Sequence, residues 1–224
     1  MPKAGRLALA IFIFALAFGL GVWGVAAYLR IQPPNVNFTS GHRPGQPVDL
    51  TVQTVGSYGH GVHADWVSYL VKGPNGRWVH STQWELPANT RVNMTIYEYD
   101  SGTPLRNAFW GRVAGVYGNS YTLNGTKKVR LLESNSTTTL VAHTFTVPAM
   151  GINVPLYAVP SSNVCAVAPC TLKEPHETIE FSFNTGHPGQ YRWQCFIPCG
   201  AGYLDGNGGP MDTLGYMAGF LKVI

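Results

Sequence analysis

The hydrophobic positions of this chain form one pattern near the N-terminus and another over the remainder. Residues 7–29 carry no charged side chain and are mostly apolar. At about 1.5 Å of rise per residue, a helix of this length extends roughly 34 Å, enough to cross a hydrocarbon layer of about 30 Å. The pattern predicts a transmembrane anchor within residues 1–30, in contact with membrane lipid.

The charges that flank the apolar stretch indicate its direction. Lys3 and Arg6 precede it, and only Arg30 follows closely. The positive-inside rule then predicts a single-pass protein of the cell membrane, with a cytoplasmic N-terminus and an extracytoplasmic C-terminal part. The alternative is a cleaved signal peptide, because residues 25–27 (Val-Ala-Ala) resemble a cleavage site. The stretch exceeds the roughly 7–15 apolar residues of a signal sequence, which favours a retained anchor.

After a Pro-, Asn- and Gly-rich stretch at residues 31–47, which reads as a linker, the pattern changes to short alternating runs. Residues 48–55 (VDLTVQTV) and 91–99 (RVNMTIYEY) alternate with period two, as half-buried strands do. Residues 73–76 (GPNG) have the composition of a hairpin turn. We expect an all-β sandwich or barrel with Greek-key-like connections over residues 48–224. Further candidate strands are residues 66–71, 77–79, 139–147, 177–183, 190–195 and 216–224.

Composition and charge exclude several functions. Charged residues make up 12% of the chain, and its 11 acidic residues show no pair suited to acid–base catalysis. Lys and Arg are scattered, without the clustered basic patch of a nucleic-acid surface, so no nucleic-acid partner is expected. The sequence has no phosphate-binding glycine loop, no G-x-S-x-G elbow and no zinc-protease motif. No catalysis by the chain itself is indicated.

The soft donor side chains lie in the last third of the chain. The sequence HTFTVP begins at His143, GQYRWQCFIPCG carries Cys195 and Cys199, and Met217 follows later. Thiol, imidazole and thioether groups suit copper as it changes oxidation state. A C-x₃-C loop has enough sulfur to bridge two copper ions, whereas a single-copper site needs one cysteine.

These segments resemble the copper A domain of cytochrome c oxidase subunit II, in the form with a single N-terminal helix that some bacterial oxidases have. The resemblance covers residues 141–224 and implies a cupredoxin-like fold, a copper cofactor and electron transfer. It also implies that oxidase subunits or another redox protein are partners. The positions that match the family's copper ligands are His143, Cys195, Cys199, Met217 and, through its backbone carbonyl, Ile197.

The match departs from the family at one ligand. The family has a second histidine four residues after the second cysteine, where this chain has Tyr203, and no histidine follows His187. His187, His176 or an upstream histidine would have to replace it, and Met211 is a further candidate sulfur ligand. The resemblance does not cover residues 48–140, whose role it leaves open.

Other interpretations of these residues stay open at the sequence level. Extracytoplasmic thiols tend to oxidise, so Cys195 and Cys199 are also candidates for a disulfide, with each other or with Cys165 and Cys170 in the Pro-rich loop at residues 159–175. The protein would then be a metal-free structural or interaction module. An exposed, incomplete site would instead suit an extracytoplasmic copper chaperone. His143 and Met217 are equally consistent with core packing, and the His60-x-x-His63 turn reads as solvated.

Overall fold

The computed structural model describes residues 2–29, 33–61, 63–133, 140–200 and 208–224, and the side chains of Tyr28 and Leu29 are not described. Helix α1 (Lys3–Leu29) and the unit Pro33–Ile224 are separate compact parts. Residues Lys3–Ala27 are long and apolar enough to cross a membrane, with a mean hydropathy of 2.3. The predicted N-terminal apolar helix is therefore confirmed as a candidate anchor or signal sequence.

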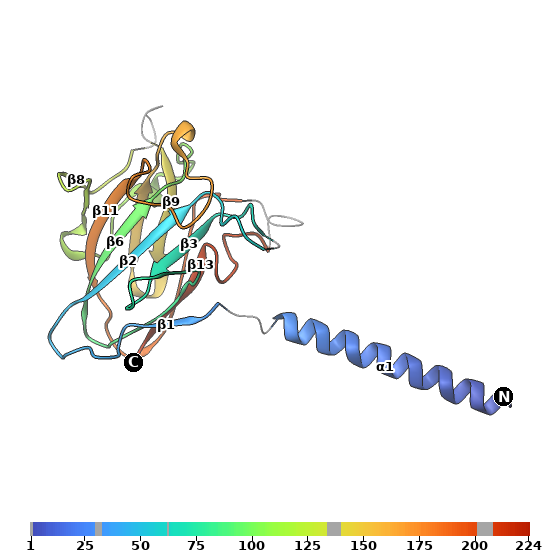
Figure 1. Ribbon diagram of the computed structural model, residues 1–224. Coiled ribbons are helices and arrows are strands. Elements are labelled where there is room, and N and C mark those ends of the chain that lie inside the picture. Colours follow the sequence, from blue (N-terminus) through green and yellow to red (C-terminus); the bar gives the residue numbers. More distant parts are fainter. Residues whose placement is uncertain (1, 30–32, 62, 134–139, 201–207) are drawn as a thin grey trace. The chain divides into compact units, whose positions relative to one another are not determined.

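The second part of the chain is a sandwich of two mixed β-sheets (Figure 1). The first sheet has the strand order β1 (Asn35–Asn37), β5 (Gln83–Leu86), β13 (Ala218–Val223), β12 (Gly189–Gln194), β9 (Val141–Val147) and β10 (Ile152–Tyr157). The second has the order β4 (Trp78–Val79), β3 (Ser68–Lys72), β2 (Val48–Val55), β6 (Arg91–Glu98), β11 (Glu177–Asn184), β7 (Tyr121–Leu123) and β8 (Lys127–Val129). Short 3-10 turns connect them at η1 (Ala108–Gly111), η2 (Tyr117–Asn119), η3 (Pro148–Met150) and η4 (Ser161–Asn163).

Neighbouring strands in both sheets are often distant in the sequence. Strand β2 pairs in parallel with β6, which pairs with β11, and the three lie side by side in Figure 1. Strand β13 likewise pairs in parallel with β5 and antiparallel with β12. Parallel neighbours require a long crossover connection, and between β2 and β6 the chain passes through β5 of the other sheet. The predicted all-β sandwich with Greek-key-like connections is confirmed.

Large aromatic side chains fill the space between the sheets. Trp84, Trp193, Phe145 and Phe183 are all almost completely buried. The rings of Trp84 and Trp193 are stacked with centroids 5.0 Å apart, and Phe145 lies 5.4 Å from Trp193. Burying each such ring contributes about 1.5–3 kcal/mol of transfer free energy, so this cluster fixes the relation of β5, β9 and β12.

The predicted strands begin and end close to the observed ones, but the sequence did not predict β1, β5, β7, β8 and β10. Strand β2 coincides with residues 48–55, whereas β1 lies inside the stretch that was expected to be a linker. Strand β1 pairs in parallel with β5, and Glu85 accepts hydrogen bonds from the side-chain amides of Asn35 (3.0 Å) and Asn37 (2.7 Å). A three-residue polar strand has no alternating pattern to reveal it.

Candidate metal centre

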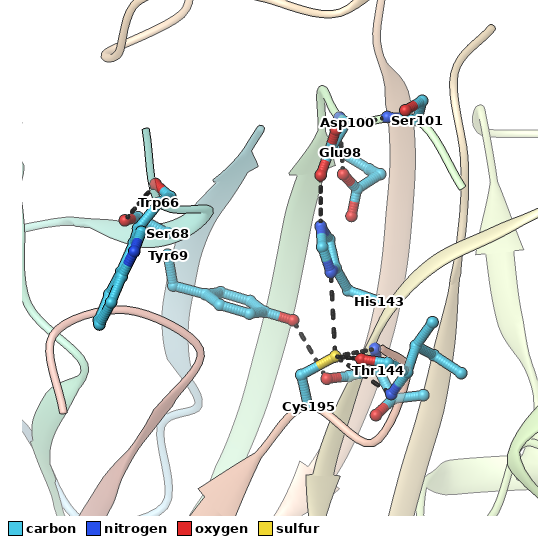
Figure 2. A network of polar contacts seen from close by, with 10 residues as sticks. Trp66, Ser68, Tyr69, Glu98, Asp100, Ser101, His143, Thr144 and Cys195 are labelled. Carbon is cyan, nitrogen blue, oxygen red and sulfur yellow. Dashed lines mark hydrogen bonds and ion pairs between the residues drawn. The ribbon is translucent and has the colours of Figure 1, made fainter. Parts of the chain in front are cut away.

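His143 occupies the middle of β9, a strand whose seven residues are all buried. Side chains two residues apart share a face of a strand, so His143 points to the same side as the core residue Phe145. A buried imidazole needs polar partners on both nitrogens. Its Nε2 atom lies 3.0 Å from Asp100 Oδ2, and its Nδ1 atom lies 3.8 Å from Cys195 Sγ (Figure 2).

Cys195 reaches this point because it directly follows β12, which neighbours β9 in the sheet. The Cys195 amide donates to the Met217 carbonyl at 2.9 Å, which ties the start of the cysteine loop to its end. The Cys195 sulfur accepts hydrogen bonds from the amides of Thr144 and Ile197, both at 3.4 Å. Two backbone donors directed at one sulfur favour its thiolate form.

One imidazole and two thiols converge at this end of the sandwich. The donor atoms of His143, Cys195 and Cys199 all lie within 4.8 Å of one another, and all three residues are buried. Cys195 and Cys199 are free, whereas Cys165 and Cys170 form a disulfide. The interpretation in which Cys195 or Cys199 is disulfide-bonded is therefore wrong, because the five-residue spacing of the other two cysteines lets them pair locally.

The two thiols differ in their electrostatics. Burial raises the pKa of Cys195, but hydrogen bonds from Cys199 and His143 lower it by more than burial raises it. The pKa of Cys195 therefore lies well below its ordinary value. The hydrogen bond to Cys195, together with burial, raises the pKa of Cys199. The geometry thus favours a Cys195 thiolate that accepts a hydrogen bond from the Cys199 thiol. The thiolate is the form of cysteine that binds metals.

Two carboxyl groups that the sequence analysis did not identify lie beside His143. Burial lowers the pKa of His143, but the neighbouring acidic groups, Glu98 first, and Cys195 raise it well above its ordinary value. Burial raises the pKa of Glu98 to about 8, against the opposing effect of His143. The Asp100 carboxylate lies 3.0 Å from His143 Nε2. Glu98 is the last residue of β6 and Asp100 follows shortly after it, in the sequence YEYD, where no motif indicated a site.

The remaining predicted site residues differ in how they relate to this cluster. The Ile197 carbonyl oxygen lies 3.4 Å from Cys195 Sγ, and Met217 is fully buried and connected to Cys195 through the backbone. His176 instead bonds the Glu174 carbonyl through Nδ1 at 2.8 Å, and His187 is exposed. Tyr203, which stands where the family has its second histidine, lies outside the described residues.

The other histidine- and cysteine-containing groups are less suited to a metal. Cys165, Cys170 and Glu174 also lie within 4.8 Å of one another, but the two sulfurs are bonded to each other. His63 stacks on Trp66 with ring centroids 3.7 Å apart. Within the part of the chain that the structure describes, neither His60 nor His63 belongs to a group with metal-ligand spacing.

The donors at His143 fit a copper ion by their chemistry. Thiolate and imidazole are the ligands that copper sites combine, and a buried site excludes water from the metal. The two unbonded sulfurs lie on one loop, and the imidazole lies on the neighbouring strand. These three residues are among the ligands that the resemblance implies, which also include Met217 and the Ile197 carbonyl.

An aromatic groove lies next to the cysteine loop. The rings of Trp110 and Phe196 stack with centroids 4.3 Å apart and planes within 9°. Both rings line a groove of about 630 Å³ that Ile197 and Arg106 also border. Phe196 stands between Cys195 and Ile197 in the sequence, so this groove approaches the candidate metal centre from outside.

No known protein family matches the sequence, and no curated protein is similar to it in sequence. The chain is similar to solved structures of rusticyanin. Rusticyanin from Thiobacillus ferrooxidans is 15% identical, with 90% of this chain and 92% of that chain covered and a TM-score of 0.34. A methionine-to-leucine variant of rusticyanin is 13% identical, with 87% and 84% covered and a TM-score of 0.36. Similarity at these levels assigns no function to this chain.

Proposed function

We propose that this protein is a membrane-anchored, cupredoxin-like copper protein that transfers electrons. The observation that carries the proposal is the convergence of one imidazole nitrogen and two unbonded sulfurs within 4.8 Å in a buried site. Two reduced cysteines so close together would be an oxidation hazard outside the cytoplasm unless a metal protected them. Bound copper would supply a one-electron redox couple.

The chain's own contribution is to hold the donors in place and keep water out. His143, Cys195 and Cys199 would be the principal ligands, with Met217 and the Ile197 carbonyl as further donors. The amides of Thr144 and Ile197 already donate to the Cys195 sulfur, so its position changes little between states of the site. A fixed donor set lowers the reorganisation that accompanies each electron transfer.

The redox partner would bind over the aromatic groove. Trp110 and Phe196 provide a flat stacked surface, and Phe109 beside them is 59% exposed. Phe196 is bonded directly to Cys195, which gives a short route from this surface to the sulfur. By the resemblance to subunit II, the partner would be an oxidase subunit or a separate redox protein.

Helix α1 bears on which side of the membrane the copper site lies. We propose that α1 remains as a membrane anchor in contact with lipid, comprising residues 1–30, with a linker and an extracytoplasmic domain after it. The extracytoplasmic location agrees with the Cys165–Cys170 disulfide, because disulfides persist in oxidising compartments.

Copper reconstitution tests the proposal. Purified protein is reduced, loaded with copper, freed of excess metal and examined for bound copper and visible absorption from sulfur-to-copper charge transfer. We expect both in the native protein and in the Cys165→Ser/Cys170→Ser control, and loss of the absorption in Cys195→Ser. Native protein that retains no copper and has no absorption would reject the proposal.

Copper delivery is a second candidate function, favoured by the presence of a single imidazole in the cluster among the described residues. A site with few strong ligands exchanges its metal readily. Rapid transfer of copper to a chelator, without a reversible redox couple, would favour delivery over electron transfer.

A further inference from the structure

Asp100 is held in one orientation at the end of β6. Its Oδ1 atom accepts a hydrogen bond from the Ser101 amide at 2.7 Å, and its own amide donates to Glu98 Oε1 at 2.8 Å. The side chain is only 14% exposed. A Cβ atom at Gly56 would lie 2.7 Å from Asp100 Oδ1, so a glycine at position 56 leaves the space that the carboxylate occupies.

This carboxylate determines how His143 presents its two nitrogens. Asp100 Oδ2 lies 3.0 Å from His143 Nε2, and an ionised carboxylate only accepts hydrogen bonds, so Nε2 must carry the proton. The other nitrogen, Nδ1, lies across the ring and faces Cys195 Sγ at 3.8 Å. Figure 2 shows Asp100, His143 and Cys195 in one continuous line of contacts.

We propose that Asp100 is a positioning residue of the copper site, which keeps the proton on His143 Nε2 and leaves Nδ1 as the atom that binds the metal. This inference deepens the proposed function and rests on it. Metal-binding histidines commonly donate their second ring N–H to such a partner, and loss of the partner typically weakens metal binding by about 10–100-fold.

The negative charge of Asp100 has a second consequence. A fixed carboxylate in contact with a ligand favours the more positive, oxidised form of the metal, and the effect is large where water is excluded. Asp100 therefore lowers the reduction potential of the site. The effect of Asp100 on the orientation of His143 and the effect of its charge can be separated by substitution. Asparagine at position 100 keeps an acceptor oxygen but has no charge, and leucine has neither.

The test compares Asp100→Asn and Asp100→Leu with the native chain and with Asp65→Asn, which removes a carboxylate from an exposed position. Each protein is measured for copper affinity, for reduction potential and, after ¹⁵N labelling of histidine, for the state of the His143 nitrogens without metal and with diamagnetic Cu(I). Thermal unfolding reports whether each variant folds.

For the native chain and Asp65→Asn, we expect a slowly exchanging Nε2–H and metal on Nδ1. Asp100→Asn should retain this pattern and shift the potential upward. Asp100→Leu should lose the slowly exchanging Nε2–H and bind copper about 10–100-fold more weakly.

Three results would overturn the proposal. Metal on Nε2 in the native chain would contradict the assigned atom. If Asp100→Leu folds and has the native copper affinity and reduction potential, the positioning role of Asp100 is rejected, whereas the proposed function stands. No copper uptake by the native chain would reject the proposed function as well. If Asp100→Leu does not fold, the other proteins provide the test. A reduction potential of Asp100→Asn equal to that of the native chain would reject the effect of charge. The protonation and metal binding of the two His143 nitrogens in the native chain would decide the orientation.

Discussion

His143 and His80 are both largely enclosed imidazoles, yet their surroundings shift the pKa in opposite directions. Acidic neighbours outweigh burial at His143 and raise its pKa. At His80, which stacks on Tyr58 with centroids 3.7 Å apart, burial lowers the pKa to about 4 against a smaller opposing effect of a backbone hydrogen bond at Gly215. The pKa of the same side chain is thus raised beside the candidate metal centre and lowered in the aromatic cluster.

His80 makes the stability of the fold depend on pH. Its folded pKa of about 4 lies below the ordinary 6.5, so between these values the unfolded chain takes up a proton that the folded chain does not. The free energy of unfolding should therefore fall as pH decreases from about 6.5 to 4. Denaturant titrations of metal-free protein should show that His80→Gln removes part of this slope. His187→Gln, which alters an exposed histidine, should retain it, and equal slopes in all three proteins would contradict the assignment.

At the scale of elements, the site depends on the pairing of β12 with β13 and of β13 with β5. Gly219 on β13 lies opposite Trp193, and the Thr82 carbonyl accepts from both the Phe220 amide (2.9 Å) and the Trp193 indole (3.2 Å). A Cβ atom at Gly219 would lie 1.8 Å from that carbonyl oxygen. The close approach of β13 to the backbone at Thr82, directly before β5, therefore requires glycine at position 219.

Gly219→Ala should lower the free energy of unfolding by about 3 kcal/mol, at the upper end of the usual range for overpacked cores, because the backbone at Thr82 must move. Gly73→Ala is the matched control, since the atom nearest to the added carbon would be Asn75 Oδ1 at 3.2 Å and the other neighbours would lie at 3.6 Å or more. Urea denaturation measures both. A loss below about 1 kcal/mol in Gly219→Ala would show that the strands separate easily.

The elements differ in how well the sequence predicts them. Strands β2 and β6 were predicted closely because their apolar positions alternate, whereas β1 is too short and polar to show a pattern. His143 and the C-x₃-C loop were found through their motif. Asp100 was not, because its contact with His143 joins positions 43 residues apart that only the folded sheets bring together. Four cysteines allow three pairings, and geometry alone selects Cys165–Cys170.

The whole molecule consists of α1 and the β-sandwich as separate compact parts. The aromatic core, both sheets and the candidate metal centre all belong to Pro33–Ile224. The apolar surface of α1 is mostly exposed within its own part, as expected of a membrane anchor or a signal sequence. Folding and membrane attachment are therefore expected to be separable.

A chain that starts at Pro33 should fold and remain soluble, whereas the full chain should stay in the membrane fraction after an alkaline wash. Circular dichroism and thermal unfolding of the truncated chain, with membrane fractionation of both, measure this. In a bacterial host, protease added to spheroplasts should digest the β-sandwich of the full chain. Protection of the sandwich would contradict the proposed orientation, and a full chain released by the wash would contradict anchoring.

The central claim is that His143 and the two free thiols form a copper site. X-ray absorption at the copper edge of the reconstituted protein tests it most directly, because it reports the atoms bonded to the metal. The account predicts sulfur and imidazole ligands in the native protein, and fewer sulfur ligands after Cys195→Ser or Cys199→Ser. A spectrum with only oxygen and nitrogen ligands, unchanged in these variants, would contradict it.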